Sequence, residues 1–412
     1  MSSFGNFQLL DPFALNMKHF SLIVIGKGLV GAAAAKYLSD DDPNVAIIGP
    51  DEPTDYDESI VFGSHYDQTR VQRIIGKDQV WTKLNLDSVK QYADLQKQSG
   101  VYFHYPVGCL YVNPNGKDGY LQNAEVLCKS LGLTFQPYRN GREIARDFKE
   151  FKFPDEAEGL LEESPAGYIN PRLLLKAQLQ MLEQKKVAIF RETVLGVEFL
   201  GDRFNLKTHE GNSYTASKVL VATGSFVNFP CLIPQKLDMR TKSEVVLSVK
   251  LGDEEAERLS RLPSLLYEID DDEKDGVYMV QPVQYPDGAY YLKLGCNTPE
   301  DIAFQNLEQV QEWFRKGESD HFAPKMLEAL RMILPSLSFT EYGTKRCITS
   351  YTVHGRPFIG ETAQRGLYIA GGCNGYSAMC SDGIGNVAAH LMINGRIPDG
   401  YDPNAFELCY KE

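Results

Sequence analysis

The first fifty residues carry the clearest hydrophobic pattern of the chain. Residues 20–25 are an aliphatic, β-branched run bounded by glycine, which predicts a strand buried on both faces. In residues 26–39, which follow, alanines favour a helix and small side chains allow it to pack closely on a sheet. A second apolar run at residues 45–48 predicts another strand, so the pattern indicates a βαβ unit.

Helical and strand patterns alternate through the middle of the chain. Residues 170–185 predict a helix, with Asn170 suited to the N-cap and Pro171 to the first turn. Residues 218–224 are a buried run that ends on a small-residue turn, as strands beside a bound nucleotide do. Further helices are expected at residues 86–100, 123–132, 302–316 and 321–333, and further strands at residues 187–200, 244–251, 277–283 and 289–295.

The end of the chain repeats the pattern of its beginning. Residues 367–395 read as a strand, a glycine-rich turn and a small-residue helix that starts at Asp382. The chain therefore leaves one domain and re-enters it twice, which predicts an α/β (α+β) fold. We assign residues 17–95, 166–235 and 346–412 to the first domain, residues 96–165 and 236–345 to the second, and residues 1–16 to a peripheral N-terminal extension.

Composition fits a globular protein and disfavours two kinds of partner. The 412 residues are 43% hydrophobic and 24% charged, which is ordinary for a folded chain. The formal net charge of −13 disfavours nucleic acid, because a surface that binds a polyanion needs basic patches. No apolar run approaches the roughly 18–20 residues that span a bilayer, so we expect no membrane partner.

Cysteines and histidines give no sign of a metal. The eight cysteines include no CxxC pair, which indicates reduced thiols in the cytoplasm and neither a zinc site nor a disulfide framework. His104, His209, His321 and His390 lack ligand spacing, so we assign no metal ligand.

A glycine motif, residues 26–31 (GKGLVG), stands between the first strand and the first helix. In a nucleotide site the first glycine allows the tight turn, the second lets a pyrophosphate approach the backbone, and the third lets helix and strand pack closely. The phosphates then lie at the helix N-terminus, where free N–H groups and the dipole favour an anion. The motif therefore predicts a Rossmann-like nucleotide-binding domain.

The acidic residue that usually binds the ribose is missing from its expected place. Gly49 stands eighteen residues beyond Gly31, and Asp51 and Glu52 follow shortly after it. Either one of these two carboxylates reaches back to the ribose, or backbone groups hold it.

Four later segments carry further signatures. Residues 63–73 read GSHYDQTRVQR, residues 290–295 read YYLKLG, residues 350–360 read SYTVHGRPFIG, and residues 372–385 form a glycine-rich loop. In order and spacing they resemble the monomeric sarcosine oxidase family, within the D-amino-acid oxidase superfamily of FAD enzymes. The resemblance implies FAD as cofactor, a Rossmann-like FAD-binding domain, and a discontinuous substrate domain built on an antiparallel sheet.

The resemblance implies catalytic roles for three basic residues. Lys293 matches the family's oxygen-activating lysine, and a cation about 4 Å from superoxide stabilises it by roughly 1–4 kcal/mol. Arg70 is expected beside the flavin and Arg73 near the substrate. Because these arginines are three residues apart, we expect them on a helical turn with both side chains on one face.

The predicted cofactor-binding residues come from three sources: the glycine motif, the run at residues 218–224 and the family resemblance. The helix that starts at Asp382 is expected to direct its positive N-terminal end to the flavin. The set consists of Gly26, Gly28, Leu29, Val30, Gly31, Asp51, Ser64, His65, Thr69, Arg70, Thr223, Gly224, Gly372, Asn374, Gly375, Tyr376 and Met379.

Three substrate-side positions differ from the sarcosine oxidase pattern. Met379 stands where that family has a lysine for the substrate carboxylate, Tyr376 stands where it has a histidine, and Asn297 replaces a second histidine. With Arg73 they form our predicted substrate-binding set. Either a carboxylate still pairs with Arg73, or Met379 marks a larger and more apolar substrate.

The same family often links FAD covalently to a cysteine just before its YT pair. Here that position is Thr349, and Cys347 lies two residues earlier on the same strand face. We expect non-covalent FAD, with Cys347 as the candidate attachment point.

The function implied is an FAD-dependent oxidase of a secondary amine or an N-substituted or cyclic amino acid. Hydride would pass from the C–N carbon to flavin N5, giving an imine, and O2 would reoxidise the flavin to give H2O2. The alternatives are a flavin dehydrogenase that passes electrons to a quinone or protein, a flavoprotein that has lost catalysis, and a biosynthetic enzyme acting on an unusual amine. We expect a cytoplasmic monomer.

Overall fold

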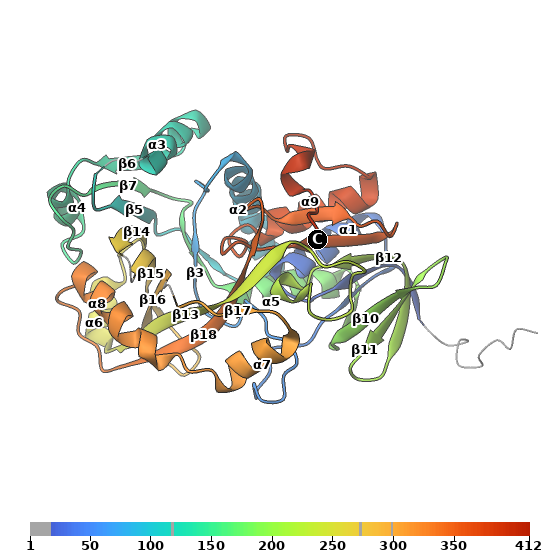
Figure 1. The fold of residues 1–412 in the computed structure, drawn as a ribbon. Coiled ribbons are helices and arrows are strands. Elements are labelled where there is room, and N and C mark those ends of the chain that lie inside the picture. Colours follow the sequence, from blue (N-terminus) through green and yellow to red (C-terminus); the bar gives the residue numbers. More distant parts are fainter. Residues whose placement is uncertain (1–17, 117–118, 272–273, 298–299) are drawn as a thin grey trace, which may run out of the picture.

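Two large sheets lie side by side in the computed structural model, which describes residues 18–116, 119–271, 274–297 and 300–412 (Figure 1). The expected extension at residues 1–16 lies outside the described residues. Each sheet is assembled from segments that are far apart in the sequence, and strands β13 and β18 extend from one sheet toward the other.

The first sheet contains the predicted βαβ unit and has eight described strands. Strand β1 pairs in parallel with β2 and β12, and β12 pairs in parallel with β20. Strand β9 pairs in parallel with β2, and the antiparallel pairs β10–β11, β11–β12 and β19–β20 complete the sheet. The strands are β1 (His19–Ile25), β2 (Val45–Ile48), β9 (Ala188–Phe190), β10 (Val194–Phe199), β11 (Phe204–Thr208), β12 (Ser213–Val221), β19 (Phe358–Glu361) and β20 (Leu367–Gly371).

Helices cover one face of this sheet. Leu22 and Val24 of β1 pack into a core shared with the helices, whereas Ile23 and Ile25 point to a second core on the opposite face. Both faces of β1 are therefore buried, as its continuous apolar run predicts. The helices are α1 (Leu29–Asp41), α2 (Gln79–Ser99), α5 (Pro171–Gln184) and α9 (Ser381–Asn394).

The starts of two of these helices can be compared with the sequence predictions. Asn170 is the N-cap of α5, and its side chain accepts a hydrogen bond from the Leu173 N–H. Helix α9 begins at Ser381, one residue before the expected Asp382.

The second sheet has nine described strands. Its pairs are antiparallel, as predicted, except that β14 runs parallel to β5. Strand β18 pairs with β13 along its whole length and thus crosses the domain boundary expected at residue 346. The strands are β5 (Cys109–Asn113), β6 (Phe135–Tyr138), β7 (Glu158–Glu162), β13 (Met239–Leu251), β14 (Ser264–Asp271), β15 (Lys274–Gln284), β16 (Tyr290–Asn297), β17 (Ala303–Phe304) and β18 (Glu341–Thr352).

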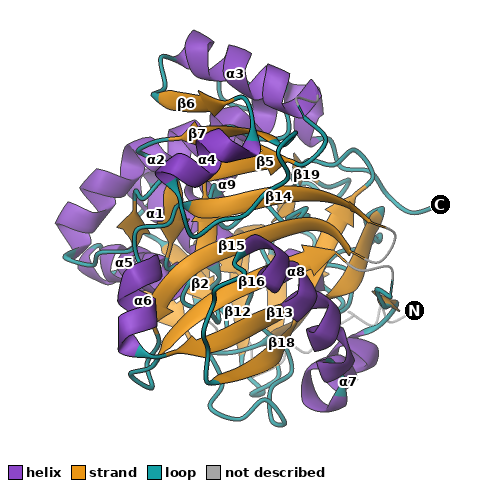
Figure 2. Ribbon diagram, turned by 90° about the vertical axis from the view of Figure 1, so that its left-hand side faces the viewer, coloured by secondary structure: helices purple, strands orange, loops and turns teal. Residues whose placement is uncertain are grey.

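Helices pack on the outer face of the second sheet. Figure 2 shows α6 and α8 in front of its strands, and Leu292 and Leu294 of β16 share a core with Met326 and Leu330 of α8. Because side chains alternate along a strand, Lys293 points to the other face, toward the first sheet. The helices are α3 (Gly119–Leu131), α4 (Gly141–Asp147), α6 (Asp253–Leu259), α7 (Leu307–Lys316) and α8 (Ala323–Ile333).

A small third sheet joins segments near the boundary between the two halves. It consists of β3 (Arg70–Gln72), β8 (Gly167–Ile169) and β4 (His104–Tyr105), with β8 in the middle and antiparallel to both neighbours. Short 3₁₀ helices occupy Gly224–Phe226, Asp320–Phe322 and Pro403–Phe406.

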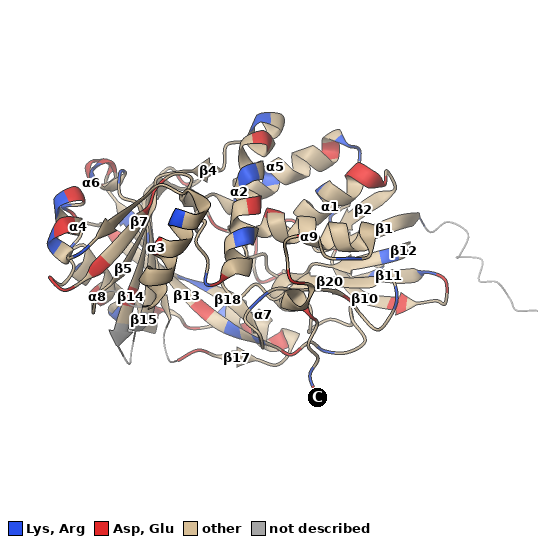
Figure 3. Ribbon diagram, turned by 90° about the horizontal axis from the view of Figure 1, so that it is seen from above, with Lys and Arg blue, Asp and Glu red and all other residues tan. Residues whose placement is uncertain are grey.

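Charged residues of both signs are interspersed along the outer helices (Figure 3). Among the described residues, no helix combines the length and the apolar character needed to cross a membrane.

Candidate active site

A cavity of about 1390 Å³ lies between the two large sheets. The turn from β1 to α1, the end of β12 and the loop before α9 line it from the first sheet. The inner faces of β13, β15, β16 and β18 line it from the second. Segments that are far apart in the sequence therefore contribute to one site.

The glycine motif adopts the expected turn at one end of the cavity. Gly26 has a φ of +106°, and a Cβ there would lie 2.4 Å from the Ala222 carbonyl oxygen. A Cβ at Gly31 would lie 1.8 Å from the Gly26 carbonyl oxygen, which explains the close packing of helix and strand. A Cβ at Gly28 would meet no atom within 4 Å, and Gly28 lines the cavity with Leu29 and Val30.

Helix α1 presents an uncapped N-terminus at this turn. Its N-cap is Gly28, and no side chain accepts a hydrogen bond from the first-turn N–H groups there. The free N–H groups and the helix dipole make this end of the cavity favourable for an anion.

The absence of an acidic residue at position 49 has a steric cause. A Cβ at Gly49 would lie 2.4 Å from the Lys27 backbone nitrogen, so no longer side chain fits. Asp51 forms ion pairs with Lys27 and Arg191 and is not among the residues lining the cavity. Glu52 does line the cavity, so of the two carboxylates left open by the sequence, Glu52 is placed to contact a ligand and Asp51 is not.

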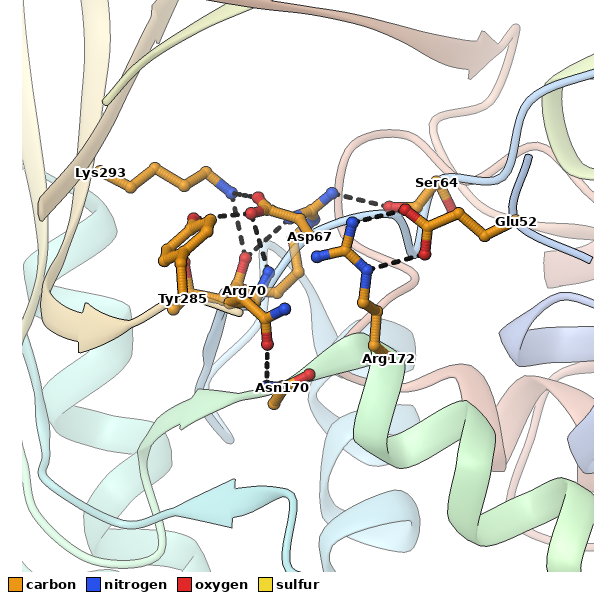
Figure 4. A network of polar contacts seen from close by, with 10 residues as sticks. Glu52, Ser64, Asp67, Arg70, Asn170, Arg172, Tyr285 and Lys293 are labelled. Atoms are coloured by element: carbon orange, nitrogen blue, oxygen red, sulfur yellow. Dashed lines mark hydrogen bonds and ion pairs between the residues drawn. The ribbon is translucent and has the colours of Figure 1, made fainter. Parts of the chain in front are cut away.

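The Asp51 and Glu52 carboxylates are both held by cations. Hydrogen bonds and charge from Lys27 and Arg191 outweigh the effect of partial burial and lower the pKa of Asp51. Glu52 accepts a hydrogen bond from the Arg172 Nε at 2.8 Å (Figure 4). Arg172 also lines the cavity.

A buried polar network surrounds Lys293 (Figure 4). The Lys293 Nζ donates to Asp67 Oδ2 at 2.6 Å and to the Thr69 carbonyl oxygen at 3.0 Å. The Arg70 Nη1 donates to the same Asp67 oxygen at 2.5 Å, and its Nη2 donates to the Ser64 carbonyl oxygen at 2.6 Å. Lys293, Arg70 and Ser64 line the cavity, whereas Thr69 lies behind the wall.

Arg73 occupies a different part of the cavity wall. Its side chain is 6% exposed, its Nη1 donates to the Tyr120 hydroxyl at 2.8 Å, and its guanidinium lies 5.5 Å and 5.4 Å from the ring centroids of Tyr111 and Tyr376. No ion pair to Arg73 is formed by the residues that the structure describes. A buried cation that borders a cavity in this way is suited to an anionic ligand.

The expectation that Arg70 and Arg73 share a helical turn was wrong. Arg70 begins strand β3, which pairs with β8, and Arg73 directly follows that strand. In extended backbone, residues three apart point to opposite sides, so one guanidinium turns to Asp67 and the other to the tyrosines. Both nevertheless line the cavity.

The loop before α9 forms another part of the cavity wall. Asn374, Gly375, Tyr376 and Met379 line the cavity, and the Met379 carbonyl oxygen accepts a hydrogen bond from Tyr92. Three predicted cofactor residues, Gly31, Thr69 and Gly372, support the wall from behind; a Cβ at Gly372 would lie 2.2 Å from Thr352 Cγ2.

Asp382 does not point its carboxylate into the cavity. It is fully buried in the first turn of α9, where it accepts hydrogen bonds from Lys36 and Tyr37 of α1. The residue joins α9 to α1 and so fixes two helices whose N-termini border the cavity.

Cys347 and Asn297 complete the set of predicted residues on the wall. Cys347 lies in β18 beside Arg70 and Lys293, and burial raises the pKa of its thiol although the two cations oppose this. Thr349 also lines the cavity, as does Asn297 at the end of β16. In the described part of the chain, no group of His, Cys, Asp and Glu side chains is arranged to hold a metal ion.

Comparison with known proteins identifies the family. The family model described as FAD dependent oxidoreductase (DAO) matches residues 21–391. The chain belongs to the DAO family of FAD-dependent oxidoreductases. The resemblance inferred from the sequence motifs is thereby confirmed.

Two curated relatives illustrate how far the similarity extends. Monomeric sarcosine oxidase of Bacillus sp. (strain B-0618) is 22% identical over 384 residues, which is 92% of this chain and 93% of the relative. N-methyl-L-tryptophan oxidase of Yersinia pestis (strain Pestoides F) is 27% identical over 210 residues, 50% of this chain and 54% of the relative. The second match thus spans about half the length of that relative.

Solved structures of the DAO type share the fold. NikD, an unusual amino acid oxidase essential for nikkomycin biosynthesis, superposes with a TM-score of 0.76 at 16% identity, covering 96% of this chain and 98% of NikD. A modified fructosyl peptide oxidase from Aspergillus nidulans gives a TM-score of 0.75 at 19% identity, covering 95% of this chain and 93% of that one. The predicted fold class is confirmed.

The residues around the cavity fit the FAD of this family. The cavity exceeds the roughly 300–1,000 Å³ of ordinary small-molecule pockets, as a dinucleotide with a substrate requires. Thr223 Oγ1 and Glu192 Oε2 are buried on its wall without a hydrogen-bond partner among the described atoms, so both are available to polar groups of a ligand. The uncapped α1 N-terminus suits the pyrophosphate.

His65 is held neutral in this DAO-family site. Burial, reinforced by the nearby cations Lys27, Arg172 and Arg70, lowers its pKa from 6.5 to about 3. The imidazole lines the cavity and packs against the Tyr66 ring at a centroid distance of 4.6 Å. It therefore contributes an uncharged surface to the wall at neutral pH.

Several wall residues were not identified from the sequence. They are Asp67, Tyr111, Tyr120, Arg172 and Glu192. Asp67 stands within the GSHYDQTR segment, and its position three residues before Arg70 was a usable signal for an ion pair. The other four lie in segments whose local pattern shows only a strand, a helix or a loop, so nothing local indicated that they would meet the cavity.

Proposed function

We propose that this DAO-family protein is an oxidase of a secondary amine or of an N-substituted or cyclic amino acid. The observation that carries the proposal is Arg73: a buried guanidinium, set among Tyr111, Tyr120 and Tyr376, that borders the cavity without an ion-pair partner among the described residues. A substrate carboxylate can accept two parallel charge-assisted hydrogen bonds from such a group.

FAD, held at the glycine motif and the uncapped N-terminus of α1, would supply the two-electron chemistry: acceptance of a hydride from the carbon next to the amine nitrogen, and reduction of O2 with two protons to H2O2. The substrate loses its nitrogen-bound proton together with the hydride and leaves as an imine. Water then converts an open-chain imine to an aldehyde or ketone and an amine, whereas a cyclic imine persists.

The chain's own residues position and polarise the reactants. Arg73 and its tyrosines would orient the substrate, and the buried wall would exclude water. Lys293 would place a positive charge where O2 is reduced. A neutral amine needs no side-chain base to start the reaction, which agrees with a wall where His65 stays uncharged and has no carboxylate partner among the described residues.

The names of the relatives support this substrate class. Sarcosine and N-methyl-L-tryptophan are both N-methyl amino acids, with a secondary amine and a carboxylate. In this chain Met379 borders the same cavity, which favours a substrate with an apolar portion. We infer that substrate identity depends on that portion.

The test is an anaerobic screen of the purified FAD-loaded protein. N-methyl amino acids, cyclic imino acids and simple amines are added in turn, and bleaching of the flavin absorbance is recorded. We expect bleaching by at least one secondary amine that carries a carboxylate, followed by H2O2 when air is admitted. If no compound bleaches a flavin that dithionite readily reduces, the proposal is refuted.

A flavin dehydrogenase that passes electrons to a quinone or protein is the second candidate. The observation that favours it is the Asp67 carboxylate, which offsets part of the positive charge of Lys293. A slow reaction of reduced flavin with O2, combined with rapid reduction of a quinone, would decide for this candidate. A biosynthetic enzyme acting on an unusual amine would give the oxidase result with a narrower substrate range.

Finer features of the protein are also proposals. We propose that FAD is held non-covalently, since Cys347 has a raised pKa and the position two residues before Tyr351 is Thr349. Precipitation with acid should release the yellow colour into solution; colour that stays with the protein and disappears in Cys347→Ala would contradict this.

Domain division and cellular context rest on the pattern of the chain. We propose domains at residues 17–95, 166–235 and 346–412, and at residues 96–165 and 236–345, with β18 shared across the last boundary. A monomer in the cytoplasm, without nucleic-acid or membrane partners, is proposed from the net charge of −13 and from cysteines spread along the sequence without a CxxC motif. Light scattering with size-exclusion chromatography tests the oligomeric state.

A further inference from the structure

Asp67 accepts hydrogen bonds through both of its carboxylate oxygens in the polar network of the cavity. One of its oxygens, Oδ2, accepts hydrogen bonds from Lys293 at 2.6 Å and from Arg70 at 2.5 Å. The other, Oδ1, accepts from the Tyr285 hydroxyl at 2.7 Å and from the Gln68 N–H at 2.8 Å. The Asp67 side chain is 7% exposed, so water does not substitute for these donors.

The network brings two cations unusually close together. Lys293 Nζ and Arg70 Nη1 bind the same oxygen atom, so they lie within about 5 Å of each other. Lys293 is 2% exposed. Arginine stays protonated in proteins whereas a buried lysine readily loses its proton. The repulsion between the two cations therefore favours loss of the proton from Lys293.

The remaining charged and titratable neighbours of Lys293 come from the adjacent strands. Tyr278 of β15 has its ring centroid 5.8 Å from Lys293 Nζ, and Cys347 of β18 is close enough to act on it electrostatically. Burial holds the pKa of Tyr278 well above its ordinary value and raises that of Cys347. Both are therefore neutral near pH 7, as is Glu244 of β13 in part, since burial raises its pKa to about 7.

Asp67 is thus the only full negative charge in contact with Lys293 among the described residues. We infer that Asp67 is a positioning residue, which keeps Lys293 protonated and directed along the cavity wall so that its charge is present when O2 is reduced. The inference rests on the proposed oxidase function. It assigns to Asp67 a role distinct from stabilising the fold, because it acts through the charge state of its neighbour.

Because the role of Asp67 acts through the charge of Lys293, it should be visible in how the reaction of reduced flavin with O2 depends on pH. Burial and the nearby Arg70 lower the pKa of Lys293 to about 8, although Asp67 opposes them. The Asp67 charge stabilises the protonated form of Lys293. Without that charge, Lys293 would lose its proton at lower pH. The reaction of reduced flavin with O2 should then fall off at lower pH as well.

The experiment compares Asp67→Asn, Asp67→Glu and Tyr285→Phe with the natural holoenzyme. Bound flavin is reduced by light and EDTA in the absence of substrate, then mixed with O2 between pH 6 and 10. In Asp67→Asn we expect the midpoint of the rate profile to move down by one unit or more, which makes reoxidation about tenfold slower at pH 9. Asp67→Glu should restore most of the profile.

Tyr285→Phe is the matched control. It removes one hydrogen bond from the same carboxylate and leaves its charge, so the midpoint should stay in place. An unchanged midpoint in Asp67→Asn, faster reoxidation by that variant at every pH, or an equal shift in Tyr285→Phe would each overturn the inference.

A second readout does not depend on turnover. The midpoint potential of the bound flavin should fall more steeply above the pH at which Lys293 loses its proton, and this break should move to lower pH in Asp67→Asn. If Asp67→Asn does not retain FAD, Lys293→Arg serves instead. Because an arginine stays charged, the reoxidation rate of the Lys293→Arg variant should not fall as the pH rises through 8. A fall like that of the natural enzyme would refute the inference.

These tests are separable from those of the proposed function. Light reduction needs no amine, so the role of Asp67 can fail while the anaerobic screen still finds a substrate. Conversely, an empty screen would leave the pH profiles of reoxidation unaffected.

Discussion

Replacement of Lys293 by methionine is the most direct probe of the oxygen reaction. The substitution keeps an unbranched side chain of similar volume in β16 and removes one positive charge that is 2% exposed. A unit charge about 4 Å from developing superoxide is worth ~1 kcal/mol in water and ~4 kcal/mol at the effective dielectric of a protein site. Because Lys293 is buried, the larger value applies, and reoxidation should slow by about 10²–10³-fold.

Stopped-flow spectroscopy can measure the two half-reactions of Lys293→Met separately. Reduction of the flavin by substrate without oxygen should change by less than about tenfold, because Lys293 bonds Asp67 and Thr69 and lies away from the Arg73 region. Tyr285→Phe again serves as a control that leaves the charge in place. Equal reoxidation rates in Lys293→Met and the natural enzyme would refute the electrostatic reasoning.

Three further outcomes are expected. Arg73→Met should weaken binding of small carboxylates such as benzoate by about 10²–10³-fold, since charged hydrogen bonds contribute roughly 1.5–3 kcal/mol each; Arg73→Lys should recover part of the affinity in a flavin-perturbation titration, and equal affinities would contradict the assignment. His65 has its pKa lowered by burial from 6.5 to about 3, so the folded protein binds fewer protons than the unfolded chain in that window and loses stability as the pH falls. His65→Gln should remove about 3 kcal/mol of that acid sensitivity in urea unfolding at pH 4 against pH 7, and an unaltered pH dependence would count against a buried neutral imidazole. Gly49→Ala should reduce FAD retention on gel filtration, because its Cβ would meet the Lys27 nitrogen at 2.4 Å; full retention would show that the turn can adjust.

Local sequence pattern was sufficient for the elements that hold the nucleotide. The βαβ unit at residues 20–48, the glycine turn and the Asn170 cap all depend on neighbours within a few residues, and each is found where expected. Alternation along residues 290–295 likewise placed Lys293 on the face opposite Leu292 and Leu294. The family motifs then predicted that widely separated segments contribute to one site, and residues of each of these segments line the cavity.

Pairing across the chain decided what the sequence left open. Arg70 and Arg73 have a helical spacing, but β3 is held extended by β8, nearly a hundred residues later, so the two side chains diverge. Asp51 and Glu52 were equivalent by sequence, and only the positions of Lys27, Arg191 and Arg172 separated them.

The sequence by itself determined the fold class and the nucleotide turn, because short-range periodicity and steric need are written into neighbouring residues. The three basic residues of the site were implied by the family resemblance. Tertiary structure alone decided the partners of those residues. Lys293 and Asp67 lie 226 positions apart, and their contact exists only because β16 of the second sheet faces the segment before β3. Buried charge depends on such contacts, since burial and the nearest ion set each pKa and neither is a property of local sequence.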